Sequence, residues 1–163
     1  MSGTGPARGA PAHADLELSV QVAAPPEHTW AVLTDWARQG EWMLGTTVAV
    51  TGGDGHSVGS TLSAKTGYGA FGFVDTMEVS EYDAKGRRCV VRHTGRLVRG
   101  EGEFAVTPNG RAGMCTVHWS ERLELPFGVV GRVGWAAGRG VFSAGVRHSL
   151  RRLARLCEAE AGG

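Results

Sequence analysis

The chain has 163 residues, of which 42% are hydrophobic and 20% charged, and its formal net charge at pH 7 is +1. This length suits one domain with a sizeable core. The balanced charge gives no reason to expect nucleic-acid binding, which usually accompanies a strongly basic domain. No apolar run approaches the length that crosses a bilayer, so we expect no membrane insertion.

The cysteines are Cys89, Cys115 and Cys157, and their spacing matches neither a zinc site nor a disulfide framework. An odd number of cysteines without a secretory signal pattern favours the cytoplasm. We expect all three to be small buried residues and expect no metal site. No glycine-rich run follows a strand and opens a helix, so no phosphate loop is indicated and we expect no cofactor.

The N-terminal residues 1–14 are rich in glycine, alanine and proline and predict a disordered arm. The folded domain is predicted over residues 15–160. It begins with strict alternation of apolar and polar residues over 15–22, which is typical of a half-buried strand.

Two short helices are expected next, over residues 27–35 and 36–43, because Pro25 and Pro26 can open a helix. The second segment carries a cluster of aromatic residues that includes Trp42. Such a cluster either fills the core or forms the lip of a pocket. We keep Trp42 as a candidate ligand contact.

Between residues 46 and 125 the sequence alternates strand patterns with turn signals such as Pro108-Asn109-Gly110. Six strands are predicted, the first over 46–51 from its β-branched residues and the others from alternation over 59–66, 71–80, 88–94, 101–106 and 114–125. The alternation predicts that the inward side chains include Phe71, Phe73, Asp75, Met77, Val91, His93, Phe104, Val117, Trp119 and Glu121.

Residues 126–160 predict one long amphipathic helix. Its apolar face continues in the second half through Leu150, Leu153 and Cys157, which we expect to dock it on the other elements. Each interior glycine costs a helix roughly 1 kcal/mol relative to alanine, so a glycine strip indicates close packing or empty space. We expect the first half to roof a cavity and to admit a ligand, with contacts from Val130, Gly134, Trp135 and Gly138.

This order of elements predicts an α+β fold in which a curved antiparallel sheet wraps around the long C-terminal helix. One face of every predicted strand is apolar, and the final helix is the only partner of suitable size for that face. A curved sheet over a glycine-rich helix face encloses space, as in ligand-holding barrels.

Three stretches carry a family resemblance: AAPPEHTWAVLTDWARQGEW, DTMEVSEYDAKGRRCVVRHTG and TPNGRAGMCTVHW. With the closing helix, they resemble the SRPBCC superfamily, which has the START-like or helix-grip fold. The chain is similar in particular to single-domain proteins called polyketide cyclase/dehydrase-like. The resemblance implies a deep hydrophobic cavity under the C-terminal helix. Members bind lipids, sterols, polyketides or plant hormones, and some are aromatases and cyclases.

The inward set contains few groups capable of acid–base chemistry. His93 paired with Asp75 or Glu121 would transfer protons, with the carboxylate orienting the imidazole. The alternative is structural: a histidine on a strand face often only hydrogen-bonds within the wall of the protein.

These observations leave three hypotheses about function. The first is a cytoplasmic carrier or sensor that holds a small hydrophobic, lipid- or polyketide-like ligand in the cavity. The second is a cofactor-independent polyketide aromatase/cyclase or lyase that uses the same cavity. The third is a protein-interaction module of the toxin–antitoxin kind. We expect a monomer or a homodimer.

Overall fold

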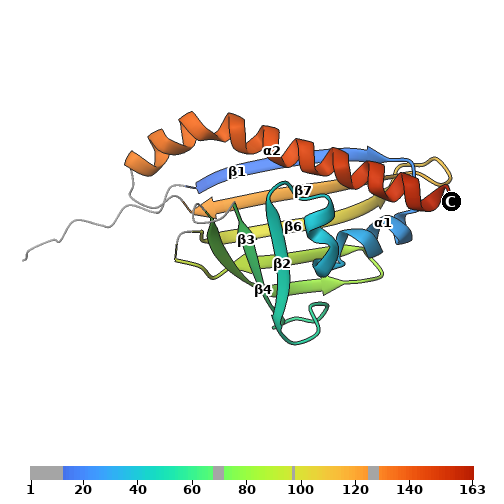
Figure 1. The fold of residues 1–163 in the computed structure, drawn as a ribbon, viewed down its shortest axis with the longest axis horizontal. Helices are drawn as coiled ribbons and strands as arrows, with labels where there is room; N and C mark the ends of the chain where they lie inside the picture. The colour runs from blue at the N-terminus through green and yellow to red at the C-terminus, as the bar shows by residue number, and fades with distance from the viewer. Residues whose placement is uncertain (1–12, 68–71, 97, 125–128) are drawn as a thin grey trace, which may run out of the picture.

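The computed structural model shows a curved antiparallel sheet wrapped around one long helix (Figure 1). It describes residues 13–67, 72–96, 98–124 and 129–163, and of Val129 and Val130 it describes only the backbone. The α+β helix-grip fold predicted from the order of the elements is therefore confirmed.

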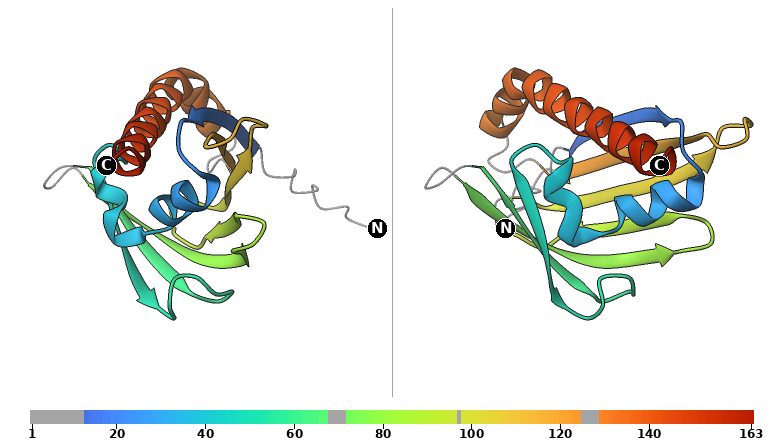
Figure 2. Two further views of the ribbon diagram at one scale, coloured as in Figure 1. Left: turned by 90° about the vertical axis from the view of Figure 1, so that its right-hand side faces the viewer. Right: turned by 45° about the vertical axis from the view of Figure 1, so that its right-hand side comes forward.

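The described part of the chain contains seven strands, and every neighbouring pair in the sheet is antiparallel. They are β1 (His13–Val22), β2 (Thr46–Gly52), β3 (Thr61–Thr66), β4 (Phe73–Asp83), β5 (Arg88–His93), β6 (Gly100–Pro108) and β7 (Cys115–Glu124). Their order across the sheet is β1-β7-β6-β5-β4-β3-β2. The sheet curves strongly, and its concave face holds the core (Figure 2).

Strands β1 and β2 are consecutive in the chain but form the two opposite edges of the sheet. The connection between them contains α1 (Pro26–Leu33) and the 3₁₀-helix η1 (Trp36–Glu41). The indole of Trp36 donates a hydrogen bond of 2.8 Å to the carbonyl of Gly55, which ties η1 to the turn between β2 and β3. The crossing segment thereby closes one side of the concave face.

The final helix, α2 (Val129–Ala161), is longer than the strands that it crosses. Its 33 residues span about 50 Å at 1.5 Å per residue, whereas the 10 residues of β7 span roughly 34 Å. The C-terminal half is docked, since Leu150, Leu153 and Cys157 are at most 1% exposed. The N-terminal part projects past the sheet (Figures 1 and 2), and Val141 in it is 79% exposed.

Several predicted boundaries need correction. Strand β1 begins at His13, two residues before the predicted start, and residues 1–12 of the predicted arm lie outside the described residues. Strand β4 runs to Asp83, beyond the predicted end at Ser80, because a register shift between Val79 and Glu81 breaks the regular alternation.

The cysteines are free and buried, as expected. Among the residues that the structure describes, no helix is both long and apolar enough to cross a membrane.

Candidate functional site

A cavity of about 280 Å³ lies between the concave face of the sheet and the middle of α2. Its volume is just below that of typical ligand cavities, which measure roughly 300–1,000 Å³. Residues of η1, of the loop after it, of the strands and of α2 contribute to the wall, and most of them are apolar. The apolar and aromatic part of the lining consists of Trp36, Met43, Leu44, Val48, Leu62, Ala64, Phe73, Met77, Val91, Val98, Phe104, Trp119, Leu123, Phe142, Gly145 and Val146.

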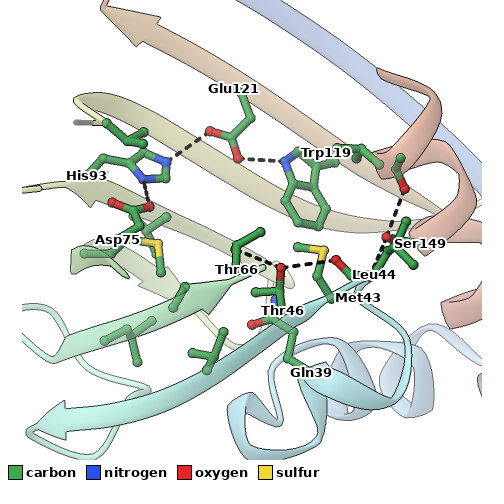
Figure 3. A pocket seen from close by; sticks show the side chains of 18 of the residues that line it. Gln39, Met43, Leu44, Thr46, Thr66, Asp75, His93, Trp119, Glu121 and Ser149 are labelled. Atoms are coloured by element: carbon green, nitrogen blue, oxygen red, sulfur yellow. Dashed lines mark hydrogen bonds and ion pairs between the residues drawn. The ribbon is translucent and has the colours of Figure 1, made fainter. Parts of the chain in front are cut away.

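One wall of this cavity carries a hydrogen-bonded chain of ionisable side chains (Figure 3). His93 Nδ1 lies 2.6 Å from Asp75 Oδ2, and His93 Nε2 lies 3.1 Å from Glu121 Oε2. The indole N–H of Trp119 donates a 2.8 Å hydrogen bond to Glu121 Oε1. The three ionisable side chains are each at most 10% exposed. We call Asp75, His93 and Glu121 the carboxylate–histidine cluster.

The strand register explains how three separate strands meet in this cluster. His93 on β5 pairs with Met77 on β4, so Asp75, two residues before Met77, lies diagonally across from the imidazole on the same face. Glu121 belongs to β7, and β6 separates it from β5. Two strand spacings amount to about 10 Å, so Glu121 must extend across β6 to reach His93.

Gly102 makes that crossing possible. It is the β6 residue directly opposite Glu121. A Cβ atom built on Gly102 would lie 3.0 Å from both carboxylate oxygens of Glu121, closer than nearly all real contacts of this kind. The missing side chain therefore leaves the space in which the carboxylate lies over β6.

The charge state of His93 follows from two opposing effects. Burial favours the neutral imidazole, but the hydrogen bonds and charges of Asp75 and Glu121 together outweigh it and raise the pKa of His93 to about 10. At neutral pH the ring is therefore an imidazolium that donates one N–H to each carboxylate. It has no free lone pair, so it cannot accept a proton while both hydrogen bonds are in place.

The opposite side of the cavity carries uncharged polar groups (Figure 3). The hydroxyls of Thr46 and Thr66 share a 2.9 Å hydrogen bond. Ser149 on α2 accepts a hydrogen bond from the Leu44 N–H and donates one to the Gly145 carbonyl. The Gln39 side chain lines the cavity in a residue only 3% exposed, and it makes no hydrogen bond to the described residues. Its amide is available to a ligand as both donor and acceptor.

The structure brings together more than half of the residues predicted for the site. Those that line the cavity are Phe73, Asp75, Met77, Val91, His93, Phe104, Trp119 and Glu121. All of them come from the period-2 alternation of the strands, which assigned the inward face correctly at these positions.

Two predicted contacts lie in the core behind the cavity wall. Trp42 and Val117 are 0% exposed and are absent from the cavity lining. The Trp42 ring packs edge-on against Trp119, with ring centroids 6.1 Å apart. Of the two alternatives for the aromatic cluster, Trp42 therefore belongs to the core.

The prediction that the glycine strip in the first half of α2 roofs the cavity is wrong. Gly134, Trp135 and Gly138 do not line it, and a Cβ atom on either glycine would meet no atom within 4 Å. The reason is the length of α2, which carries this part past the sheet. Its cavity-facing residues lie further along, at Phe142, Gly145, Val146 and Ser149.

Two predicted contacts cannot be placed. Phe71 lies outside the described residues, and so does the side chain of Val130. In the ranges that the structure covers, no group of three or more His, Cys, Asp or Glu side chains is suited to a metal ion.

Sequence reasoning missed Gln39, Ser149 and the role of Gly102. Gln39 lies in a 3₁₀-helix, in which residues three apart share a face, so the buried Trp36 three residues earlier was a usable signal. Ser149 left a usable signal, because it is a polar residue next to Leu150 on the apolar face of a helix. Gly102 is informative only once the pairing of β6 with β7 is known.

Replacing Gly102 by alanine is expected to push the Glu121 carboxylate away from His93. The pKa of His93 should then fall from about 10, because one of the two carboxylates that raise it is displaced. An NMR titration of the labelled imidazole measures the change. Gly140→Ala, a helical position where a Cβ meets no atom within 4 Å, is the control. An unaltered His93 titration in Gly102→Ala would contradict the role of Gly102.

Comparison with known proteins agrees with this architecture. The family described as polyketide cyclase / dehydrase and lipid transport matches residues 13–158. A crystal structure of a protein from Thermus thermophilus is similar with a TM-score of 0.76 at 15% identity, covering 91% of this chain and 99% of that one. No match was found among curated protein sequences.

Two further solved structures share the fold. The ZhuI aromatase/cyclase from Streptomyces sp. R1128 has a TM-score of 0.74 at 17% identity, over 90% of this chain and 94% of that one. Norcoclaurine synthase from Thalictrum flavum has a TM-score of 0.66 at 18% identity, over 96% and 94%. The family match spans nearly all of the described fold, and the chain belongs to the polyketide cyclase/dehydrase and lipid transport family.

Proposed function

We propose that this protein binds a small, mainly apolar molecule in the cavity between the sheet and α2. The observation that carries the proposal is the cavity itself, about 280 Å³ of space with a largely apolar wall and a few convergent polar groups. A carrier or a sensor needs no more than this.

The comparisons support a small ligand with ring character. One related structure is an aromatase/cyclase, and the norcoclaurine synthase structure contains dopamine and hydroxybenzaldehyde. Aromatic residues at the cavity wall suit such a molecule, since Phe104 and Trp119 pack edge-to-face with centroids 4.6 Å apart.

Filling the cavity from α2 tests the proposal. Gly145 lines the cavity, and a Cβ there would meet no atom within 4 Å, so Gly145→Leu should place its side chain in the ligand space. We expect binding of the neutral fluorescent probe N-phenyl-1-naphthylamine to weaken about tenfold or more, because a leucine side chain replaces apolar ligand contact. Fluorescence titration measures the affinity.

Gly134→Leu is the matched control for this experiment. Like Gly145→Leu, it replaces a glycine of α2 by leucine and raises the helix propensity by the same amount. Gly134, however, lies in the projecting part of the helix, which does not line the cavity. Its affinity for the probe should equal that of the wild type. Equal affinities for the wild type and Gly145→Leu would count against ligand binding at this cavity.

A second candidate function is an enzyme of the aromatase/cyclase or dehydratase kind, favoured by the carboxylate–histidine cluster in the wall. Because His93 is held as an imidazolium, proton acceptance in such an enzyme falls to Asp75 or Glu121. Native mass spectrometry of protein purified from its own host separates the two functions. A co-purifying compound that the protein releases without chemical change indicates a carrier. If the protein instead converts an added polyketone chain to a product of different mass, it is an enzyme.

The protein-interaction hypothesis required a filled interior beside an exposed apolar patch. The cavity under α2 does not meet the first condition, so this hypothesis has the weakest support. The cytoplasmic location and the oligomeric state stay predictions.

A further inference from the structure

The wall formed by β4, β5 and β7 has hydrogen-bond acceptors left over but no donors. Its donors are the two imidazole N–H groups of His93 and the indole N–H of Trp119. All three already donate to Asp75 or Glu121. Two carboxylates together offer about eight lone-pair sites, so most of their accepting capacity stays unused by these bonds.

The net charge of the side chains that line the cavity is negative. Of the described residues that line it, only Asp75, His93 and Glu121 ionise. Two carboxylates against one imidazolium leave a net negative charge, and a neutral imidazole would make the charge more negative still. The other charged groups near His93 lie in a separate depression outside the cavity, lined by Arg92, Arg99, Glu101, Arg122 and Glu124.

We infer that the cavity selects apolar ring compounds that carry a hydrogen-bond donor, a hydroxyl or an ammonium group, directed at Asp75 and Glu121, and that it rejects carboxylates. This inference rests on the proposed function, because it names the ligand class of the same cavity. A carboxylate directed at this wall would place further negative charge, and no donor, beside two buried carboxylates. An ether of the same shape would leave those oxygens unpaired.

A series of naphthalenes with different substituents tests the inference at pH 7. The compounds are 2-naphthol, 2-(aminomethyl)naphthalene, 2-methoxynaphthalene and 2-naphthoate, with naphthalene as the reference. Hydrogen bonds to charged groups predict that the hydroxyl or the ammonium compound binds about ten- to hundredfold tighter than the ether. The naphthoate should bind more weakly than naphthalene. The two donor compounds show whether a neutral or a cationic group is preferred.

Two variants connect this preference to the cluster. Glu121→Gln removes one charge and supplies an amide donor, so it should bind naphthoate more tightly than the wild type does. Glu101→Gln removes a charge from the exposed outer side of the neighbouring strand and should leave the order of affinities unchanged.

The outcomes separate this inference from the proposed function. Naphthoate binding as tightly as 2-naphthol, or the ether binding as tightly as both donor compounds, overturns the inference even if N-phenyl-1-naphthylamine responds to Gly145→Leu. If neither that probe nor any naphthalene binds, the proposed function fails and the inference fails with it.

Discussion

Replacing both carboxylates of the cluster, by Asp75→Asn with Glu121→Gln, should lower the pKa of His93 from about 10 to below its ordinary value of 6.5. Burial is the strongest single influence on this imidazole and favours its neutral form; only the two carboxylates reverse that effect. The amides keep the shape of the site but remove both charges. NMR titration of the labelled ring measures the shift.

Each single variant should give a pKa between those of the wild type and the double variant. Glu101→Gln, outside the cavity, is the control and should leave the titration unchanged. A double variant whose His93 still titrates near 10 would show that something other than Asp75 and Glu121 sets its charge.

The raised pKa of His93 also predicts how the stability of the protein depends on pH. The pKa of His93 is higher in the folded protein than in the unfolded chain, so the wild type gains stability that is fully present below about 6.5 and lost as pH rises through about 10. The rise from 6.5 to about 10 corresponds to a gain on the order of 5 kcal/mol, at about 1.36 kcal/mol per pKa unit. Urea unfolding between pH 6 and pH 11 should show this loss in the wild type but not in the double variant. Groups that titrate in both proteins cancel in the comparison.

The fold was predictable because each strand buries one face and one long helix closes the chain. Alternation in β7, for example, placed Trp119 and Glu121 inward, and both line the cavity. The position of α2 along the sheet was not predictable in this way. A helical pattern shows which face is apolar, but the excess length of α2 appears only when the helix lies against strands of known extent.

The candidate site was predictable only in part, for a related reason. His93, Asp75 and Glu121 could each be assigned inward from their own strand, but their contact depends on strand pairing. Strand β6 lies between Glu121 and His93. Glu121 reaches across it only because β6 has a glycine, Gly102, at the crossing point. Gln39 lies three residues after Trp36, on the same face of the 3₁₀-helix, but a polar residue beside an aromatic one does not by itself mark a ligand contact.

Leu153→Ala should destabilise the protein by about 2–5 kcal/mol, the usual cost of truncating a fully buried leucine. Leu153 is 0% exposed and lies in the half of α2 that is docked on the core. Several hydrogen bonds hold the same half. Arg152 donates to the Glu41 carbonyl at 2.7 Å, and the Ala23 N–H donates to Glu158 at 2.9 Å. Urea unfolding monitored by tryptophan fluorescence measures the loss.

Val141→Ala is the matched control on the projecting part of the same helix. Val141 is 79% exposed, and surface substitutions of this kind usually change stability by less than about 0.5 kcal/mol. A loss of unfolding free energy for Val141→Ala as large as that for Leu153→Ala would show that the first half of α2 is packed as firmly as the second.

Hydrogen exchange gives an independent measurement. Amides of residues 132–142 should exchange faster than those of residues 146–157, because few tertiary contacts oppose local opening there. Such opening would widen access to the cavity beside Phe142 while Leu150 and Leu153 keep the helix attached.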